Sequence, residues 1–151
     1  IMNEIYEQIE ERINNSSKKT IYSSIILGFL MICIIIYLAF SSIEHKIVPI
    51  VFTAILLFFF IFDICITKIS NKKTISGIYR WRPELIPCVI KEKHKNYITV
   101  SIPDTETVYN ISIKNECNLK ENSSSCYLVY QSFFGVNTKN ERILVSNGKI
   151  Y

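Results

Sequence analysis

The chain has 151 residues, a formal net charge of +4 and only four glycines. It contains no phosphate-binding glycine loop, no G-x-S-x-G motif and no other catalytic or metal-ligand spacing, which argues against the enzyme classes that depend on them. We therefore expect no enzymatic activity, no cofactor and no metal site.

The first twenty residues show a helical repeat. Apolar side chains recur at helical spacing from Met2 to Ile13, and four glutamates lie on the other faces. This pattern predicts a cytoplasmic amphipathic helix within residues 1–20, which ends near the polar run Asn14 to Ser17. An anionic membrane surface would repel its acidic face. We expect it to pack against protein, either the chain's own basic domain or a second subunit.

Two long uncharged segments follow, Ile21 to Ile43 and Ile47 to Phe62, and only Glu44 to Lys46 lie between them. A bilayer core needs about 20 apolar residues per helix, so each segment is long enough to span it. The sequence predicts transmembrane helices over 21–43 and 47–67. The short connection makes them antiparallel neighbours, and Pro49 fits the first turn of the second helix.

Flanking charges predict the orientation of this hairpin. Lys18 and Lys19 precede the first span, Lys68 and Lys72 follow the second, and the loop between the spans carries one lysine beside a glutamate. Positive charge favours the cytoplasmic side. We expect a multi-pass protein of the cell membrane with both termini in the cytoplasm and all five cysteines as free thiols. In the reverse orientation, Cys117 and Cys126 could form a disulfide.

Beyond the spans the pattern changes to alternation. Short apolar and alternating runs between residues 85 and 146 are separated by turn residues, and Asn147-Gly148 is the strongest hairpin motif of the chain. We expect five or six antiparallel strands and no useful helix over 74–151, forming a small all-β, barrel-like domain of SH3 or OB size in the cytoplasm. We also expect this domain to fold without the helices before it.

Basic residues concentrate in this second half, which has 12 Lys and Arg against 7 Asp and Glu from Asn71 onward. The only tryptophan stands between two arginines, and further lysines surround a predicted turn. The candidate ligand-binding residues are Arg80, Trp81, Arg82, Lys93 and Lys95. An indole can stack on a base and guanidinium groups can hold phosphate, which suits a phosphate-bearing small ligand rather than a nucleic acid. Anchoring of the tryptophan at the headgroups, or its packing in the core, would account for the same residues.

Three residues in the spans are candidates for helix contacts. Asp63 is the only ionisable residue inside a predicted span, where it could form an interfacial ion pair with Lys19 or Lys68, join helices of an oligomer, or line an ion path. Ser24 and Gly28 form a small-xxx-small pair that allows close approach of another helix. All three are predicted contacts of a transmembrane oligomer.

Two functional classes remain. In the first, the chain is a non-enzymatic subunit or adaptor of a membrane complex, and its β domain docks a partner protein. In the second, it is a ligand-gated effector that disrupts the membrane. The order of its elements resembles that of bacterial anti-phage membrane effectors, in which a two-helix anchor precedes a β-barrel that senses a cyclic nucleotide. That resemblance implies nucleotide sensing and homo-oligomerisation in the bilayer.

Overall fold

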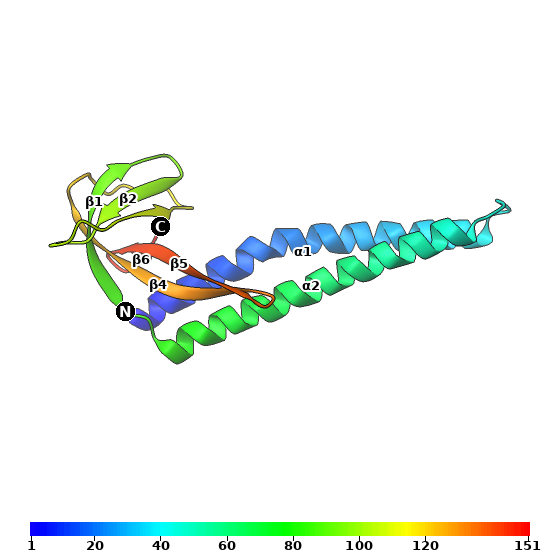
Figure 1. The fold of residues 1–151 in the computed structure, drawn as a ribbon, viewed down its shortest axis with the longest axis horizontal. Helices are drawn as coiled ribbons and strands as arrows, with labels where there is room; N and C mark the ends of the chain where they lie inside the picture. Colours follow the sequence, from blue (N-terminus) through cyan, green and yellow to red (C-terminus); the bar gives the residue numbers. More distant parts are fainter.

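The computed structural model describes all 151 residues. A long antiparallel helical hairpin carries a β-sheet at the end where both termini lie (Figure 1). The two helices are α1 (Met2–Phe40) and α2 (Ile47–Trp81). Both are long and apolar enough to cross a membrane, as the sequence predicts.

Helix α1 is continuous, so the predicted end near Asn14 to Ser17 is wrong. The hydroxyl groups of Ser16 and Ser17 donate hydrogen bonds to the carbonyl oxygen of Ile13, one turn earlier. From α2, the amide of Asn71 donates to the hydroxyl oxygen of Ser17 at 2.6 Å. These bonds satisfy the polar side chains within the helix and across the hairpin, where the sequence pattern alone had indicated a turn.

Helix α2 also extends further than predicted, because it continues through Thr74 to Trp81. The expectation of no helix beyond Thr74 is therefore wrong for these eight residues. The helix ends where Arg82 adopts a left-handed conformation with φ of 46°, directly before Pro83. A proline disfavours helical geometry in the residue before it, which gives this boundary a local cause.

Six antiparallel strands follow, in the order β3-β2-β1-β4-β5-β6 across one sheet. The strands are β1 (Leu85–Lys93), β2 (Tyr97–Ser101), β3 (Val108–Ser112), β4 (Ser124–Phe134), β5 (Asn137–Ser146) and β6 (Lys149–Ile150). The predicted strands and the Asn147-Gly148 hairpin are confirmed, and both turn residues have positive φ.

The sheet is curved but open, so the predicted antiparallel β domain is confirmed but its closure into a barrel is not. The guanidinium carbon of Arg142 on β5 lies 3.9 Å from the ring centroid of Tyr109 on β3, which shows how far the sheet curls. No ladder of hydrogen bonds joins its edge strands, and β6 at one edge has only two residues. Closure requires such a ladder between the first and last strands.

Different parts of the chain cover the two faces of the sheet. The inner, curled face is filled by its own side chains, namely Cys88, Ile90, Ile98, Val100, Ile111, Tyr127, Leu144 and Tyr151. The other face is covered by the helices. Its core consists of Leu128, Ile143, Val145 and Ile150 of the strands, Ile5, Tyr6 and Ile9 of α1, and Ile78 of α2. The amphipathic start of α1 thus packs on the chain's own β domain, the first of the two predicted alternatives.

A polar clamp reinforces this packing. The amide group of Gln8 donates to the carbonyl oxygen of Gly148 at 2.7 Å and accepts from the backbone N–H of Ile150 at 3.2 Å. The hydroxyl of Tyr6 donates to the carbonyl oxygen of Pro83 at 2.8 Å. Because α1 supplies core residues and hydrogen bonds, residues 74–151 alone would expose an apolar sheet face. The structure therefore argues against independent folding of that segment.

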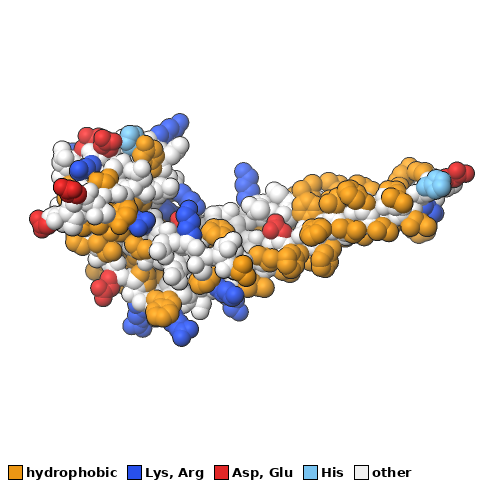
Figure 2. Space-filling model, in the orientation of Figure 1, with side chains coloured by type: hydrophobic (Ala, Val, Ile, Leu, Met, Phe, Trp, Pro, Cys, Tyr) orange, Lys and Arg blue, Asp and Glu red, His pale blue; other side chains and the backbone are white.

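The far half of the hairpin has no such cover. In the most apolar segment of α1 only 11% of the residues are buried, and in that of α2 none are. Figure 2 shows hydrophobic side chains along this half, with charged ones at the connecting loop and around the β domain. A core helix of a soluble protein would instead be covered by protein.

Candidate functional site: a basic groove between α2 and the β4–β5 hairpin

A groove of about 800 Å³ lies between the last turns of α2 and strands β4 and β5. We call it the basic groove. From α2 and the residues after it come Ile69, Lys72, Lys73, Ser76, Gly77, Ile78, Arg80, Trp81 and Pro83. From the strands come Val129, Tyr130, Gln131, Phe133 and Asn140.

The spacing of residues on α2 explains how the groove forms. Ser70, Thr74 and Ile78 recur every fourth residue, so they share one helix face, and all three are buried against the sheet. The backbone N–H of Phe133 donates to the hydroxyl oxygen of Thr74 at 3.0 Å, and that of Gly135 donates to the hydroxyl oxygen of Ser70 at 2.9 Å. These bonds fasten β4 to α2. The neighbouring stripe of the helix then lines the groove.

The groove carries positive charge without compensation. Lys72, Lys73 and Arg80 line it, and none of its lining residues is acidic. The two salt bridges of the chain lie elsewhere, at Glu92 with His94 and at Lys139 with Glu141. The three cations of the groove are therefore free to meet an anionic partner.

Two aromatic residues give the groove its other properties. Trp81 is 76% exposed, and the guanidinium carbon of Arg80 lies 5.6 Å from its ring centroid. Tyr130 lies at the inner wall, where burial raises its pKa to about 12, with Glu141 raising and Arg12 lowering it to a smaller extent. Its hydroxyl thus remains a hydrogen-bond donor at neutral pH. The groove offers an apolar surface, a donor and three cations together.

The predicted ligand-binding residues do not form one site. Arg80 and Trp81 line the groove, whereas Arg82 follows the helix and is not among its lining residues. Lys93 and Lys95 lie at the β1–β2 turn. The nine residues of β1 separate that turn from α2, and the eight steps from its first to its last residue correspond to about 26 Å at about 3.3 Å each.

Side chains at the β1–β2 turn contact one another. His94 lies 3.2 Å from a carboxylate oxygen of Glu92 and stacks on Tyr97 with ring centroids 4.3 Å apart.

Core packing of the tryptophan, one of the interpretations of the Arg-Trp-Arg motif, is wrong because Trp81 is largely exposed. The sequence predicts that the second span ends at Thr67, and Trp81 lies 14 residues beyond it, about 21 Å along the helix axis, which argues against headgroup anchoring.

Sequence reasoning missed Lys72 and Lys73 as members of this site. Lys72 and Arg80 are eight residues apart, a spacing that brings them to one helix face. That relation becomes visible only once α2 is known to extend past Thr67. With the helix expected to end there, the two lysines indicated orientation alone.

Ser24 and Gly28 are both buried in α1, and Gly28 faces Leu57 of the second helix of the same chain. A Cβ atom at Gly28 would lie 3.5 Å from the Cδ1 atom of Leu57, an ordinary contact distance. The close helix approach expected from this pair therefore occurs within the hairpin. A contact with a second chain at these residues stays a prediction.

Asp63 has an exposed side chain and forms no salt bridge, so the expected ion pair with Lys19 or Lys68 is not formed. Its backbone carbonyl oxygen accepts a hydrogen bond from the hydroxyl of Thr67 at 2.9 Å. All five cysteines are free thiols, including Cys117 and Cys126.

Comparison with protein-family models, with curated proteins and with solved structures finds no match to this chain.

Proposed function

We propose that the chain is a non-enzymatic membrane protein that docks a partner protein in its basic groove. The observation that carries this proposal is the combination of a largely exposed Trp81 with three uncompensated cations beside it. Tryptophan and arginine are enriched among the residues that contribute most to binding at protein interfaces. A groove with this lining favours an acidic segment that also presents an apolar side chain.

The helical hairpin would serve as the anchor of this docking domain. Its apolar half is uncovered, and the polar loop at its tip could emerge on the opposite side of the bilayer. The lysines beside the spans favour a cytoplasmic location for both termini and for the β domain. We place the protein in the cell membrane on these grounds.

The β domain is joined to both helices by core packing and hydrogen bonds, not by a flexible linker. The basic groove therefore has a fixed height above the membrane. A partner would have to present its acidic segment at that height, as another subunit of a membrane complex would. This geometry supports a role as subunit or adaptor.

Photo-crosslinking in cells tests the proposal. A photoreactive phenylalanine analogue at Trp81 should give a discrete crosslinked partner, whereas the same analogue at Tyr97, on the β1–β2 hairpin, should not. Lys72→Glu with Lys73→Glu should abolish the crosslink, and the exposed control Lys114→Glu should leave it intact. A crosslink that survives charge reversal in the groove, or one equally strong from Tyr97, would contradict docking at this site.

The second candidate, a ligand-gated effector, draws on the same groove. Three cations beside an indole also suit a phosphate-bearing ligand, and the curled interior of the sheet is filled by side chains, so such a ligand would have to bind in the groove. Titration of the purified chain in lipid nanodiscs with nucleotides, followed by the fluorescence of Trp81, separates the two. Saturable quenching that is lost in the Lys72→Glu and Lys73→Glu variant would favour the effector.

A further inference from the structure

The turn between β4 and β5 presents apolar side chains that nothing in the chain covers. Val136 is 97% exposed and Phe134 is 63% exposed. The other two-residue hairpin turn of the domain is Asn147-Gly148, which is polar as solvent-exposed turns usually are. Figure 1 shows the β4–β5 hairpin lying along α2, with its tip directed toward the apolar half of the helical hairpin.

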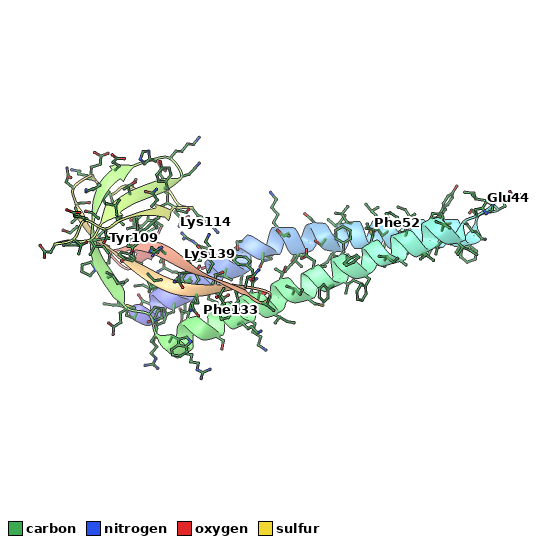
Figure 3. All side chains as sticks on the ribbon, in the orientation of Figure 1. Glu44, Phe52, Tyr109, Lys114, Phe133 and Lys139 are labelled. Atoms are coloured by element: carbon green, nitrogen blue, oxygen red, sulfur yellow. The ribbon has the colours of Figure 1, made fainter.

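Contacts with α2 fix the height of this tip. The backbone N–H of Gly135 donates to the hydroxyl oxygen of Ser70 at 2.9 Å. A Cβ atom at Gly135 would lie 3.9 Å from the Cγ2 atom of Ile66. Figure 3 shows Phe133, two residues earlier, beside α2. The turn is therefore level with residues 66–70 of the helix.

The predicted bilayer surface falls at the same level. From Ile47 to Ile66, α2 has twenty residues, about 30 Å of helix, which equals the thickness of the hydrocarbon core. Lysines just outside both spans lie near this level, since Lys18 and Lys68 line one cleft together with Ile21. Lysines at such a boundary reach the headgroups.

We propose that the β4–β5 turn is a third membrane contact, which places Phe134 and Val136 in the lipid at the cytoplasmic surface. This inference rests on the proposed insertion of the hairpin. Two apolar side chains at this depth gain from transfer out of water, and the lysines nearby favour anionic headgroups. With the two spans, the turn would fix the tilt of the β domain and hence the direction in which the basic groove opens.

Tryptophan fluorescence can test this contact, because the chain has one native tryptophan. In a Trp81→Phe background, three full-length variants receive a new tryptophan by Val136→Trp, Phe52→Trp or Val108→Trp. Phe52 is the sixth residue of α2 and lies within the predicted span, and Figure 3 places Tyr109, the neighbour of Val108, at the opposite end of the molecule. Each variant is reconstituted in phosphatidylcholine nanodiscs with or without bromine on the acyl chains.

We expect brominated lipid to quench the Val136→Trp and Phe52→Trp variants several-fold more strongly than the Val108→Trp variant, and the emission of both to shift to the blue. Quenching of Phe52→Trp alone would overturn the third contact while leaving the spanning hairpin intact. Absence of quenching in Phe52→Trp would overturn the spanning hairpin itself, and with it the inference drawn from it.

Discussion

Replacing Ile9 with alanine should destabilise the β domain, although Ile9 is a residue of α1. Its side chain is fully buried against the sheet, in the cluster that Leu128 and Ile143 share. The substitution removes three carbon atoms, about 2.4 kcal/mol at about 0.8 kcal/mol each, and the cavity left behind raises the cost to about 3 kcal/mol. A loss of this size increases the population of the opened domain about 100-fold.

Thiol labelling of Cys88 measures this opening. Cys88 lies on the opposite, curled face of the sheet and is 1% exposed, so it reacts only when the domain opens. In detergent micelles at one fixed pH, mass spectrometry of the digested chain resolves its labelling from that of the other four cysteines. The rate for Ile9→Ala should rise about 100-fold when opening is rapidly reversible.

Glu11→Ala, an exposed change on the same helix, is the matched control and should alter the labelling rate little, since surface substitutions stay within about 0.5 kcal/mol. Labelling of Cys88 in Ile9→Ala at the rate of the unaltered chain, with α1 still helical, would contradict this prediction. That result would mean that the sheet is stable without the cover of α1.

Burial or exposure of Cys88, Gly28 and Asp63 determines how each responds to a change. Burial, with a smaller effect of Cys126, raises the pKa of Cys88 from 9.0 to about 11, so between these pH values the folded chain retains a proton that the unfolded chain loses. The denaturation midpoint should therefore fall as pH rises from about 9 to about 11. The Cys88→Ala variant should show a smaller decline. Gly28→Ala should leave the thermal unfolding temperature in micelles near that of the unaltered chain, because the new Cβ atom meets Leu57 at an ordinary contact distance. Gly28→Ile should lower this temperature. Equal unfolding temperatures for the two variants would contradict the close helix approach. Asp63→Asn should not weaken insertion or reduce crosslinked oligomers, because the exposed carboxylate makes no ion pair that the substitution would break and a charge in the lipid disfavours insertion. A loss of higher-order crosslinks would instead assign Asp63 to an oligomer contact.

The sequence was sufficient for features encoded by local pattern. The uncharged run from Ile47 predicts a long apolar helix, and Asn147-Gly148 predicts a hairpin because both residues tolerate positive φ. The alternation from Tyr97 to Ser101 predicts a strand with one buried face, and Ile98 and Val100 are indeed fully buried.

Features that depend on distant contacts were not predictable in this way. The polar run at Asn14 to Ser17 has the composition of a helix end, but it remains helical beside Asn71 of the other helix. The curl of the sheet brings Arg142 to Tyr109 without closing a barrel, which alternation cannot reveal. For the same reason the basic groove was predicted only in part, through Arg80 and Trp81, because its lysines join it through the extension of α2.

In the proposed topology, the helical hairpin crosses the cell membrane with its loop outside and its β domain in the cytoplasm. Thiol labelling can distinguish this topology from the reverse one. Intact cells that express the His45→Cys variant are treated with a membrane-impermeant maleimide, labelling is read site by site by mass spectrometry, and a lysate serves as the reactivity control. His45 lies in the exposed loop between the spans, and Cys117 lies in the β domain and is partly exposed. We expect rapid labelling at position 45 and labelling of Cys117 only after lysis. Labelling of Cys117 in intact cells, with position 45 protected, would contradict this topology.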